Sequence, residues 1–390
     1  MNSFRYYQPT EILFGCGQID NIAALSQRFG KRCLLVTTPT VPELEPMFKR
    51  VKEILGKVGL DVAHFDGIQP NPTTDNISEG AGVALSHQAE MVIGLGGGSA
   101  MDGAKAIAVE TSHDGTAWDY LFYRKAQPTD KTLPVIAVST TSGTGSQVTQ
   151  VAVMTNTRDR DKSAIYSSSV FPRASIVDPE LMLTVPKHIT ASTGFDVFCH
   201  AFESMLHSQA SPYTDVLALS AIQLVVNYLP AVLENLSDLE ARTKLALADT
   251  YAGLCIANAG VTLPHGVGMA VSGMYPYVAH GESLAAVYPA FTRFSRSSAV
   301  RQFAAVGRIL DPGLRTFSEK QAAERSCSLI DDFLDKIGLA TTLKDLRMPE
   351  EEIPDLAVQS MKLPDYKANP RVTSADEMLE LIRDAYAGKK

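Results

Sequence analysis

Short apolar runs alternate with amphipathic stretches in the first half of the chain. Residues 31–37, 89–95 and 133–139 each contain a run of apolar residues, which is typical of strands buried on both faces. Between the first two runs, residues 43–58 have the apolar spacing of a helix. Buried strands separated by helices predict a parallel sheet with helices on both faces.

The pattern changes near residues 178–180, after which long segments with helical periodicity replace the strand-like runs. Residues 211–229 are apolar at positions three and four apart, and Pro230 is expected to end or kink that helix. Further helices are expected over residues 239–260, 297–309, 320–337 and 375–387, the last with Ser374 as its N-cap. We therefore expect an α/β domain over residues 1–185 and an all-helical domain over residues 186–390. A small-molecule site is expected in a cleft between them.

Composition and charge restrict the class of protein. The 390 residues are 45% hydrophobic, as in globular proteins, and carry 35 basic and 43 acidic side chains for a net charge of −8. An acidic chain without a basic run is not expected to bind nucleic acid. The glutamates at 350–352 are expected to begin a solvated helix. Five scattered cysteines, the absence of a signal-peptide pattern and the absence of 18 consecutive apolar residues predict a cytoplasmic protein that does not cross a membrane.

Three consecutive glycines, Gly96, Gly97 and Gly98, follow the second apolar run and precede a stretch compatible with a helix. Residues without side chains let backbone N–H groups approach a phosphate, and the start of a helix favours negative charge. Ser99 stands where the usual dinucleotide motif has its third glycine. A tight turn between strand and helix explains the glycines equally well.

A loop rich in hydroxyl groups, residues 139–146, follows the third apolar run. Ligands of parallel sheets bind at the carboxyl ends of the strands, so this loop could form a second wall of a phosphate and ribose pocket. The alternative is an ordinary polar surface loop.

Asp196 and His200 are four residues apart, which places both on one face of a helix. His265 and His280 lie in segments with little charge and several glycines. One carboxylate and three imidazoles would suit Zn²⁺ or Fe²⁺ with a coordination position left for a substrate oxygen. A surface hydrogen bond between Asp196 and His200 is the alternative.

Together, ordered motifs along nearly the whole chain resemble the iron-containing (group III) alcohol dehydrogenases. The matching positions are Phe14-Gly15, Asn71-Pro72-Thr73, Gly96 to Ser99 with Asp102 and Lys105, Thr140-Thr141 with Gly143 to Ser146, Lys162, Asp178 to Leu181, Asp196 with His200, Ser211-Pro212 with Thr214-Asp215, His265, His280-Gly281 and Asn369-Pro370-Arg371. The resemblance implies a Rossmann-like nucleotide-binding domain followed by a helical-bundle, metal-binding domain, the fold shared with dehydroquinate synthase.

The resemblance also implies roles for individual residues. Asp196, His200, His265 and His280 match the family's metal ligands and are the expected catalytic centre. The expected cofactor-binding residues are Thr38, Asn71, Gly96, Gly97, Gly98, Ser99, Asp102, Thr140, Thr141, Thr144, Lys162 and Leu181. The cofactors implied are NAD(H), with NADP(H) not excluded, and one divalent metal, Fe²⁺ or Zn²⁺. A homo-oligomer, dimeric or larger, is implied as well.

Three positions depart from the family pattern. Met269 stands where many members have a histidine thought to relay the proton, and a thioether cannot do so. Thr38 replaces an aspartate that would repel the 2′-phosphate of NADP. Gln147 occupies a place where glutamate is usual, and nothing in the sequence explains that change.

The expected function is a metal-dependent, NAD(P)-linked interconversion of a small primary alcohol and its aldehyde, either of which could carry a second hydroxyl or an anionic group. A hydroxyacid–oxoacid transhydrogenase and a 4-hydroxybutyrate-type dehydrogenase are alternatives. A lyase related to dehydroquinate synthase and a non-catalytic nucleotide or metal sensor are less favoured.

Overall fold

The computed structural model describes residues 3–389, which form two compact units. One is an α/β unit of residues 8–185 and 236–246, and the other is a helical unit of residues up to 7, 186–235 and from 247 onward. Helix α7 (Leu239–Asn258) begins in the first unit and continues in the second.

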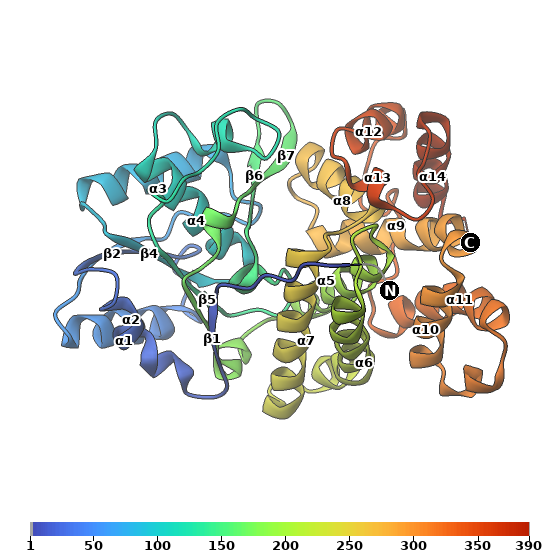
Figure 1. Ribbon diagram of the computed structural model, residues 1–390, viewed down its shortest axis with the longest axis horizontal. Coiled ribbons are helices and arrows are strands. Elements are labelled where there is room, and N and C mark those ends of the chain that lie inside the picture. Colours follow the sequence, from blue (N-terminus) through green and yellow to red (C-terminus); the bar gives the residue numbers. More distant parts are fainter. Residues whose placement is uncertain (1–2, 390) are drawn as a thin grey trace. The chain divides into compact units, whose positions relative to one another are not determined.

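A six-stranded parallel sheet forms the centre of the α/β unit (Figure 1). Its order is β1-β8-β5-β4-β2-β3, with every neighbouring pair parallel. The strands are β1 (Glu11–Phe14), β2 (Arg32–Val36), β3 (Asp61–Phe65), β4 (Met91–Gly96), β5 (Val135–Ser139) and β8 (Ala174–Val177). Strands β6 (Val151–Asn156) and β7 (Asp161–Tyr166) form a separate antiparallel hairpin. The three predicted strands correspond to β2, β4 and β5.

Helices cover both faces of this sheet because alternate residues of each strand point in opposite directions. Cys33 and Leu35 of β2 pack in one buried cluster with α1 (Ile22–Ser26) and α2 (Glu45–Lys57). Leu34 and Val36 pack in another with α3 (Thr74–Ser86) and α4 (Gly98–Ser112). Short 3₁₀ helices occupy connections at Gln18–Asn21, Ala117–Tyr120, Ser146–Val148, Ser168–Val170 and Pro179–Met182.

The second unit is helical, and among the described residues every strand lies before residue 178. Its helices are α5 (Lys187–Leu206), α6 (Pro212–Glu234), most of α7, α8 (Leu263–Met274), α9 (His280–Ser295), α10 (Val300–Leu310), α11 (Glu319–Lys336), α12 (Ile353–Ser360), α13 (Asp365–Ala368) and α14 (Ala375–Ala387), with 3₁₀ turns at Arg296–Ser298, Pro312–Thr316 and Glu350–Glu352. Helices pack mainly as the pairs α5–α6, α8–α9 and α10–α11. Ser374 caps α14 by accepting a hydrogen bond from the backbone N–H of Glu377, as predicted.

Helix α6 continues through Pro230 to Glu234, so of the two outcomes expected at Pro230 the structure contradicts a helix end there. A proline removes one backbone hydrogen bond, but Val232 and Leu233 are buried in the last turn and their packing opposes that loss. Within the described part of the chain, α6 is also the single unbroken helix long and apolar enough to cross a membrane. Length and composition are weak evidence for a span, because core helices of water-soluble proteins meet the same test.

Candidate active site

Helix α5 places Asp196 and His200 one turn apart on the same face, in a buried setting. His200 Nε2 lies 3.6 Å from Asp196 Oδ1. Both residues are at most 5% exposed, so they do not form the surface pair that the sequence left as an alternative.

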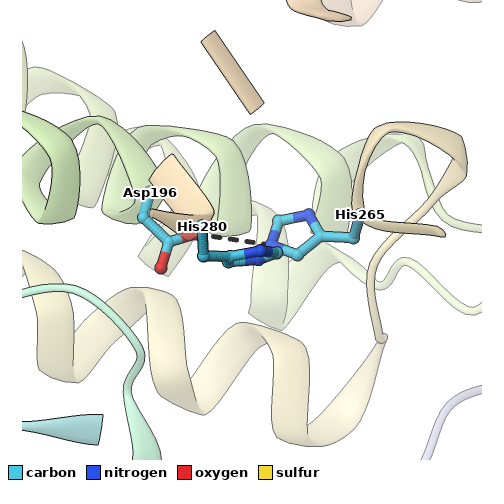
Figure 2. Close-up of side chains that lie close together, drawn as sticks. All are labelled: Asp196, His265 and His280. Atoms are coloured by element: carbon cyan, nitrogen blue, oxygen red, sulfur yellow. Dashed lines mark ion pairs between the residues drawn. The ribbon is translucent and has the colours of Figure 1, made fainter. Parts of the chain in front are cut away.

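Two further helices bring the remaining histidines to this carboxylate. His265 lies in the first turn of α8, and its Nε2 is 3.4 Å from Asp196 Oδ1. His280 is the first residue of α9. One ligand atom each from Asp196, His265 and His280 lies within 4.8 Å of the other two, and Figure 2 shows the three side chains converging.

His200 joins this group through its ring. The centroids of the His200 and His265 rings are 4.6 Å apart in a stacked arrangement, and those of His265 and His280 are 5.3 Å apart. All four predicted ligands therefore lie in one place, with Asp196, His265 and His280 as the tightest group.

The donor set fits a divalent cation. Asp196 Oδ1 and His265 Nε2 are buried and face each other, yet neither makes a hydrogen bond. Buried polar atoms without a hydrogen bond are rare, and a bound metal ion would satisfy both.

Electrostatics at this position agree with that fit. Burial alone would raise the pKa of Asp196, but the surrounding histidines, His200 most strongly, lower it to about 2. Burial would lower the pKa of His265, whereas Glu203 and Asp196 raise it to about 10. Asp196 is therefore ionised, which is the form of a carboxylate that binds a metal ion.

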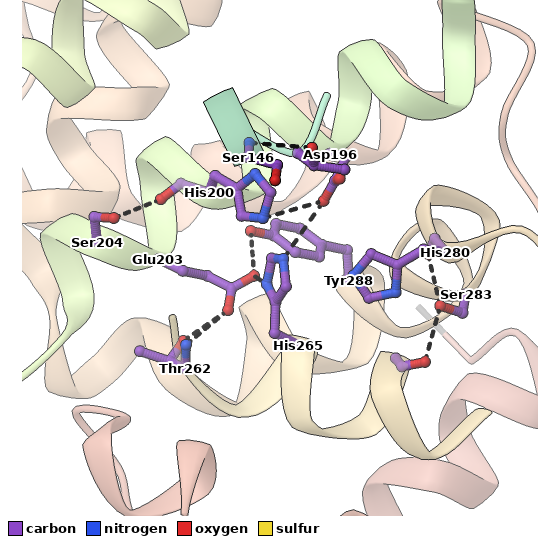
Figure 3. Close-up of polar contacts among 12 residues, drawn as sticks. Ser146, Asp196, His200, Glu203, Ser204, Thr262, His265, His280, Ser283 and Tyr288 are labelled. Atoms are coloured by element: carbon purple, nitrogen blue, oxygen red, sulfur yellow. Dashed lines mark hydrogen bonds and ion pairs between the residues drawn. The ribbon is translucent and has the colours of Figure 1, made fainter. Parts of the chain in front are cut away.

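Two carboxylates beside the cluster were missed by the sequence analysis (Figure 3 shows the first). Glu203, on α5, accepts a hydrogen bond from His265 Nδ1 at 2.8 Å. Asp365, on α13, packs over Gly266, where an added Cβ would be 3.6 Å from Asp365 Oδ2, and burial raises the pKa of Asp365 to about 6. Glu203 could have been found from its spacing, because seven residues after Asp196 it lies on the same face of the predicted helix. No comparable spacing in the sequence points to Asp365, which lies in a short helix.

Met269 lies one turn after His265 on α8 and is partly exposed. The helix therefore offers a thioether one turn after the proposed ligand His265. That side chain cannot transfer a proton.

In the α/β unit, the predicted glycine loop connects β4 to α4 at the carboxyl edge of the sheet. Gly96 has a φ of 153°, a value that favours glycine. Gly97 precedes α4, and Gly98 is its first residue. A Cβ at residue 98 would lie 2.7 Å from Thr144 Oγ1 and 3.0 Å from Thr144 Cβ, so any larger residue there would displace Thr144.

The hydroxyl loop lies directly beside these glycines. Ser139 pairs with Gly96, and the Thr140 N–H donates to the Gly96 carbonyl at 3.0 Å. A Cβ at Gly97 would lie 3.0 Å from Thr141 Oγ1. Ser99, Thr141 and Thr144 remain partly exposed at this edge, whereas Thr140 is buried.

The strand order places this edge at the reversal point of the sheet. From β2 the chain adds β3 on one side and β4 on the other, so the carboxyl ends of β2 and β4 flank the point where open α/β sheets bind ligands. Thr38, two residues beyond β2, is partly exposed at this end.

Asn71 and Lys162 come together, although they are 91 residues apart. Lys162 Nζ on β7 donates a hydrogen bond to Asn71 Oδ1 at 2.7 Å, and Asn71 has a φ of 57°. Leu181 follows β8 in a 3₁₀ turn and packs against the apolar cluster on one face of the sheet.

Asp102 is held by protein groups. Its carboxylate accepts hydrogen bonds from Ser146 Oγ at 2.6 Å and from the Val153 N–H at 3.1 Å. Lys105, fully buried on the same helix, donates to the carbonyls of Ser146, Thr149 and Val151 at 2.7–2.9 Å. The side chains of Asp102 and Lys105 therefore hold residues 146–153, at the end of the hydroxyl loop and just beyond it, against helix α4.

A glycine loop at the reversal point of a parallel sheet and a buried Asp–His cluster are features of metal-dependent, nicotinamide-linked enzymes. The sequence model described as "Iron-containing alcohol dehydrogenase" matches residues 9–179, and that described as "Fe-containing alcohol dehydrogenase family, C-terminal" matches residues 190–386. The chain belongs to the iron-containing alcohol dehydrogenase family.

Individual relatives are similar to this chain over nearly the full length of both proteins. The 1,3-propanediol dehydrogenase of Klebsiella pneumoniae is 31% identical over 98% of this chain and 99% of its own. The crystal structure of an archaeal Red Sea brine pool alcohol dehydrogenase has a TM-score of 0.95 at 33% identity, covering 99% of this chain and all of that one. The sulfoacetaldehyde reductase of Bifidobacterium kashiwanohense, solved in complex with NAD⁺, has a TM-score of 0.84 at 30% identity, with complete coverage of both chains.

Membership confirms the predicted family and fold class. The protein is an oxidoreductase that acts on CH–OH groups with a nicotinamide nucleotide as acceptor.

Proposed function

We propose that this protein interconverts a small primary alcohol and its aldehyde with NAD(H), at a centre that holds one divalent metal ion, Fe²⁺ or Zn²⁺. The supporting observation is the convergence of Asp196, His265 and the partly buried His280, with His200 beside them and with Asp196 Oδ1 and His265 Nε2 buried without a hydrogen bond.

The four side chains Asp196, His200, His265 and His280 would hold the ion. When bound, the cation would stabilise an alkoxide or polarise an aldehyde carbonyl. The buried position of the cluster restricts access of bulk water, which strengthens electrostatic interactions there. Because Met269 cannot accept the alcohol proton, that proton must leave through water, the cofactor ribose or another group beside the ligands.

Nucleotide binding is proposed for the carboxyl edge of the sheet. Gly96, Gly97, Gly98 and Ser99 at the start of α4 would contact the pyrophosphate, because backbone N–H groups and the helix dipole converge there. Thr140, Thr141 and Thr144 would contact phosphates and ribose. Thr38, Asn71, Lys162 and Leu181 would line the rest of the site. We assign Asp102 an indirect role, through Ser146.

The substrate is proposed to be a short aldehyde that is neutral or carries one anionic group. The names of the relatives, a 1,3-propanediol dehydrogenase and a sulfoacetaldehyde reductase, support both kinds. Thr38 in place of an acid leaves NADP(H) as a second acceptor to test.

Oxidation of NADH and NADPH should be screened against short neutral and anionic aldehydes, using metal-free protein and protein loaded with Fe²⁺ or Zn²⁺. We expect turnover with NADH that requires added metal. Turnover between a hydroxyacid and an oxoacid without added nucleotide would instead select the transhydrogenase. Binding of NADH or NADPH without reduction of any of these aldehydes would contradict the proposed function.

We also propose a cytoplasmic location and homo-oligomeric assembly. All five cysteines are thiols, which supports a reducing compartment. Assembly rests on the family resemblance.

A further inference from the structure

Glu203 is a buried carboxylate in the same helix as two of the proposed metal ligands. It follows Asp196 by seven residues and His200 by three, so the three side chains form one stripe along α5. Its side chain is completely buried. A carboxylate in such a place is costly unless its oxygens are fully hydrogen-bonded.

Four donors surround Glu203, two at each oxygen (Figure 3). Oε1 accepts from His265 Nδ1 at 2.8 Å and from the Tyr288 hydroxyl at 3.2 Å. Oε2 accepts from the backbone N–H of Thr262 at 2.8 Å and from its Oγ1 at 3.2 Å. Four acceptor positions are about what an ionised carboxylate offers.

These donors come from the other two helices that provide metal ligands. Thr262 is the N-cap residue of α8, which contains His265, and Tyr288 lies on α9, which begins at His280. One side chain therefore ties α5, α8 and α9 together close to the cluster.

The contact with His265 determines which ring nitrogen is available. An ionised carboxylate only accepts hydrogen bonds, so His265 Nδ1 must bear the hydrogen. In the neutral ring the lone pair is then on Nε2, the atom that lies 3.4 Å from Asp196 Oδ1 within the cluster. Such outer carboxylates orient metal-binding histidines in many proteins.

We propose that Glu203 is a positioning residue of the metal centre: it holds His265 in the tautomer that offers Nε2 to the ion. It also supplies a second negative charge beside Asp196 that balances a divalent cation. The inference rests on the proposed metal-dependent function.

Glu203→Gln tests it with little change in shape. Both oxygens of Glu203 face an N–H group, from His265 and from Thr262, and an amide can accept from only one of them. We expect the affinity for Zn²⁺, measured by competition with a chelator, to fall about 10- to 100-fold. Affinity for NADH should stay unchanged.

Tyr288→Phe is the matched control, because it removes one donor to the same oxygen and leaves the His265 hydrogen bond in place. We expect its Zn²⁺ affinity to remain within about threefold of the wild-type value, a change small beside that expected for an outer-shell carboxylate. Equal loss in both variants, or unchanged affinity in Glu203→Gln, would overturn the proposal.

Nitrogen NMR of the Zn²⁺-loaded wild-type protein provides a readout that does not depend on the variants folding. The proposal predicts a hydrogen on His265 Nδ1 and none on Nε2, and the opposite assignment overturns it. Wild-type protein that binds neither Zn²⁺ nor Fe²⁺ would overturn the proposed function as well, whereas tight Zn²⁺ binding with the wrong tautomer would overturn this inference alone.

Discussion

The glycine-loop edge of the sheet and the metal cluster of the helical unit are built in opposite ways. At the sheet edge, the glycine loop and the hydroxyl loop, both proposed to bind nucleotide, each follow the end of a strand. Because Gly96 to Gly98 carry no side chains, a phosphate could approach the backbone there closely. In the cluster, side chains from three helices up to 84 residues apart converge in a buried space.

This difference determines which amino-acid substitutions each site tolerates. The sheet edge should fail when a side chain is added, whereas the cluster should fail when a side chain is removed. Damage to one should leave ligand binding at the other intact.

The largest effect is expected from His265→Ala. The variant should lose its bound metal, and turnover should fall about 1,000-fold or more, because several kcal/mol of charge stabilisation are lost and each 1.4 kcal/mol is worth tenfold. Metal analysis and steady-state kinetics test this, with His188→Ala on the exposed start of α5 as the control. Full metal content in His265→Ala would remove it from the ligand set.

Lys105→Met should destabilise the α/β unit strongly. It leaves three carbonyls, two of them buried, without their ammonium donor and Asp102 without its nearby positive charge, at a cost of about 3 kcal/mol. Denaturant unfolding of the metal-loaded protein measures this. Lys57→Met, at an exposed position of α2, should change the free energy of unfolding by less than about 0.5 kcal/mol. Similar values for the two variants would show that the buried contacts contribute little.

Gly98→Ala should weaken NADH binding about 10- to 100-fold, because overpacking against Thr144 costs about 1–3 kcal/mol and displaces the loop. Fluorescence titration with NADH measures the loss, and metal content should not change. Gly82→Ala on α3 is the matched control, since no atom lies within 4 Å of its added Cβ. Unaltered NADH affinity in Gly98→Ala would place the nucleotide elsewhere.

The smallest effect is expected from Thr38→Asp. A carboxylate at this partly exposed position would repel a 2′-phosphate by about 1 kcal/mol in a hydrated setting, so use of NADPH relative to NADH should fall about fivefold. The ratio of kcat/KM for the two nucleotides tests this. A ratio that does not change would mean that residue 38 lies away from the ribose.

Periodicity predicted β2, β4, β5 and most long helices because those segments bury continuous or evenly spaced apolar residues. It left open whether Pro230 ends or kinks the helix, which in the structure continues to Glu234. A strand such as β1 was too short to be recognised.

The site residues also divide into those that local sequence predicts and those that depend on contacts between helices. Asp196 and His200 were predicted from their spacing within one helix. His265 and His280 were predicted from the low charge and the glycines of their segments, together with the resemblance to a family. Glu203 was not, because its significance lies in contacts with Thr262, His265 and Tyr288, which only the packing of three helices creates.

Anomalous X-ray diffraction at the zinc edge, from crystals of Zn²⁺-loaded protein, tests the metal centre most directly. The account predicts one strong peak within ligand distance, about 2.0–2.2 Å, of Asp196 and the histidines that surround it. A peak bound by other residues, or none near Asp196 in protein that turns over alcohol, would contradict it.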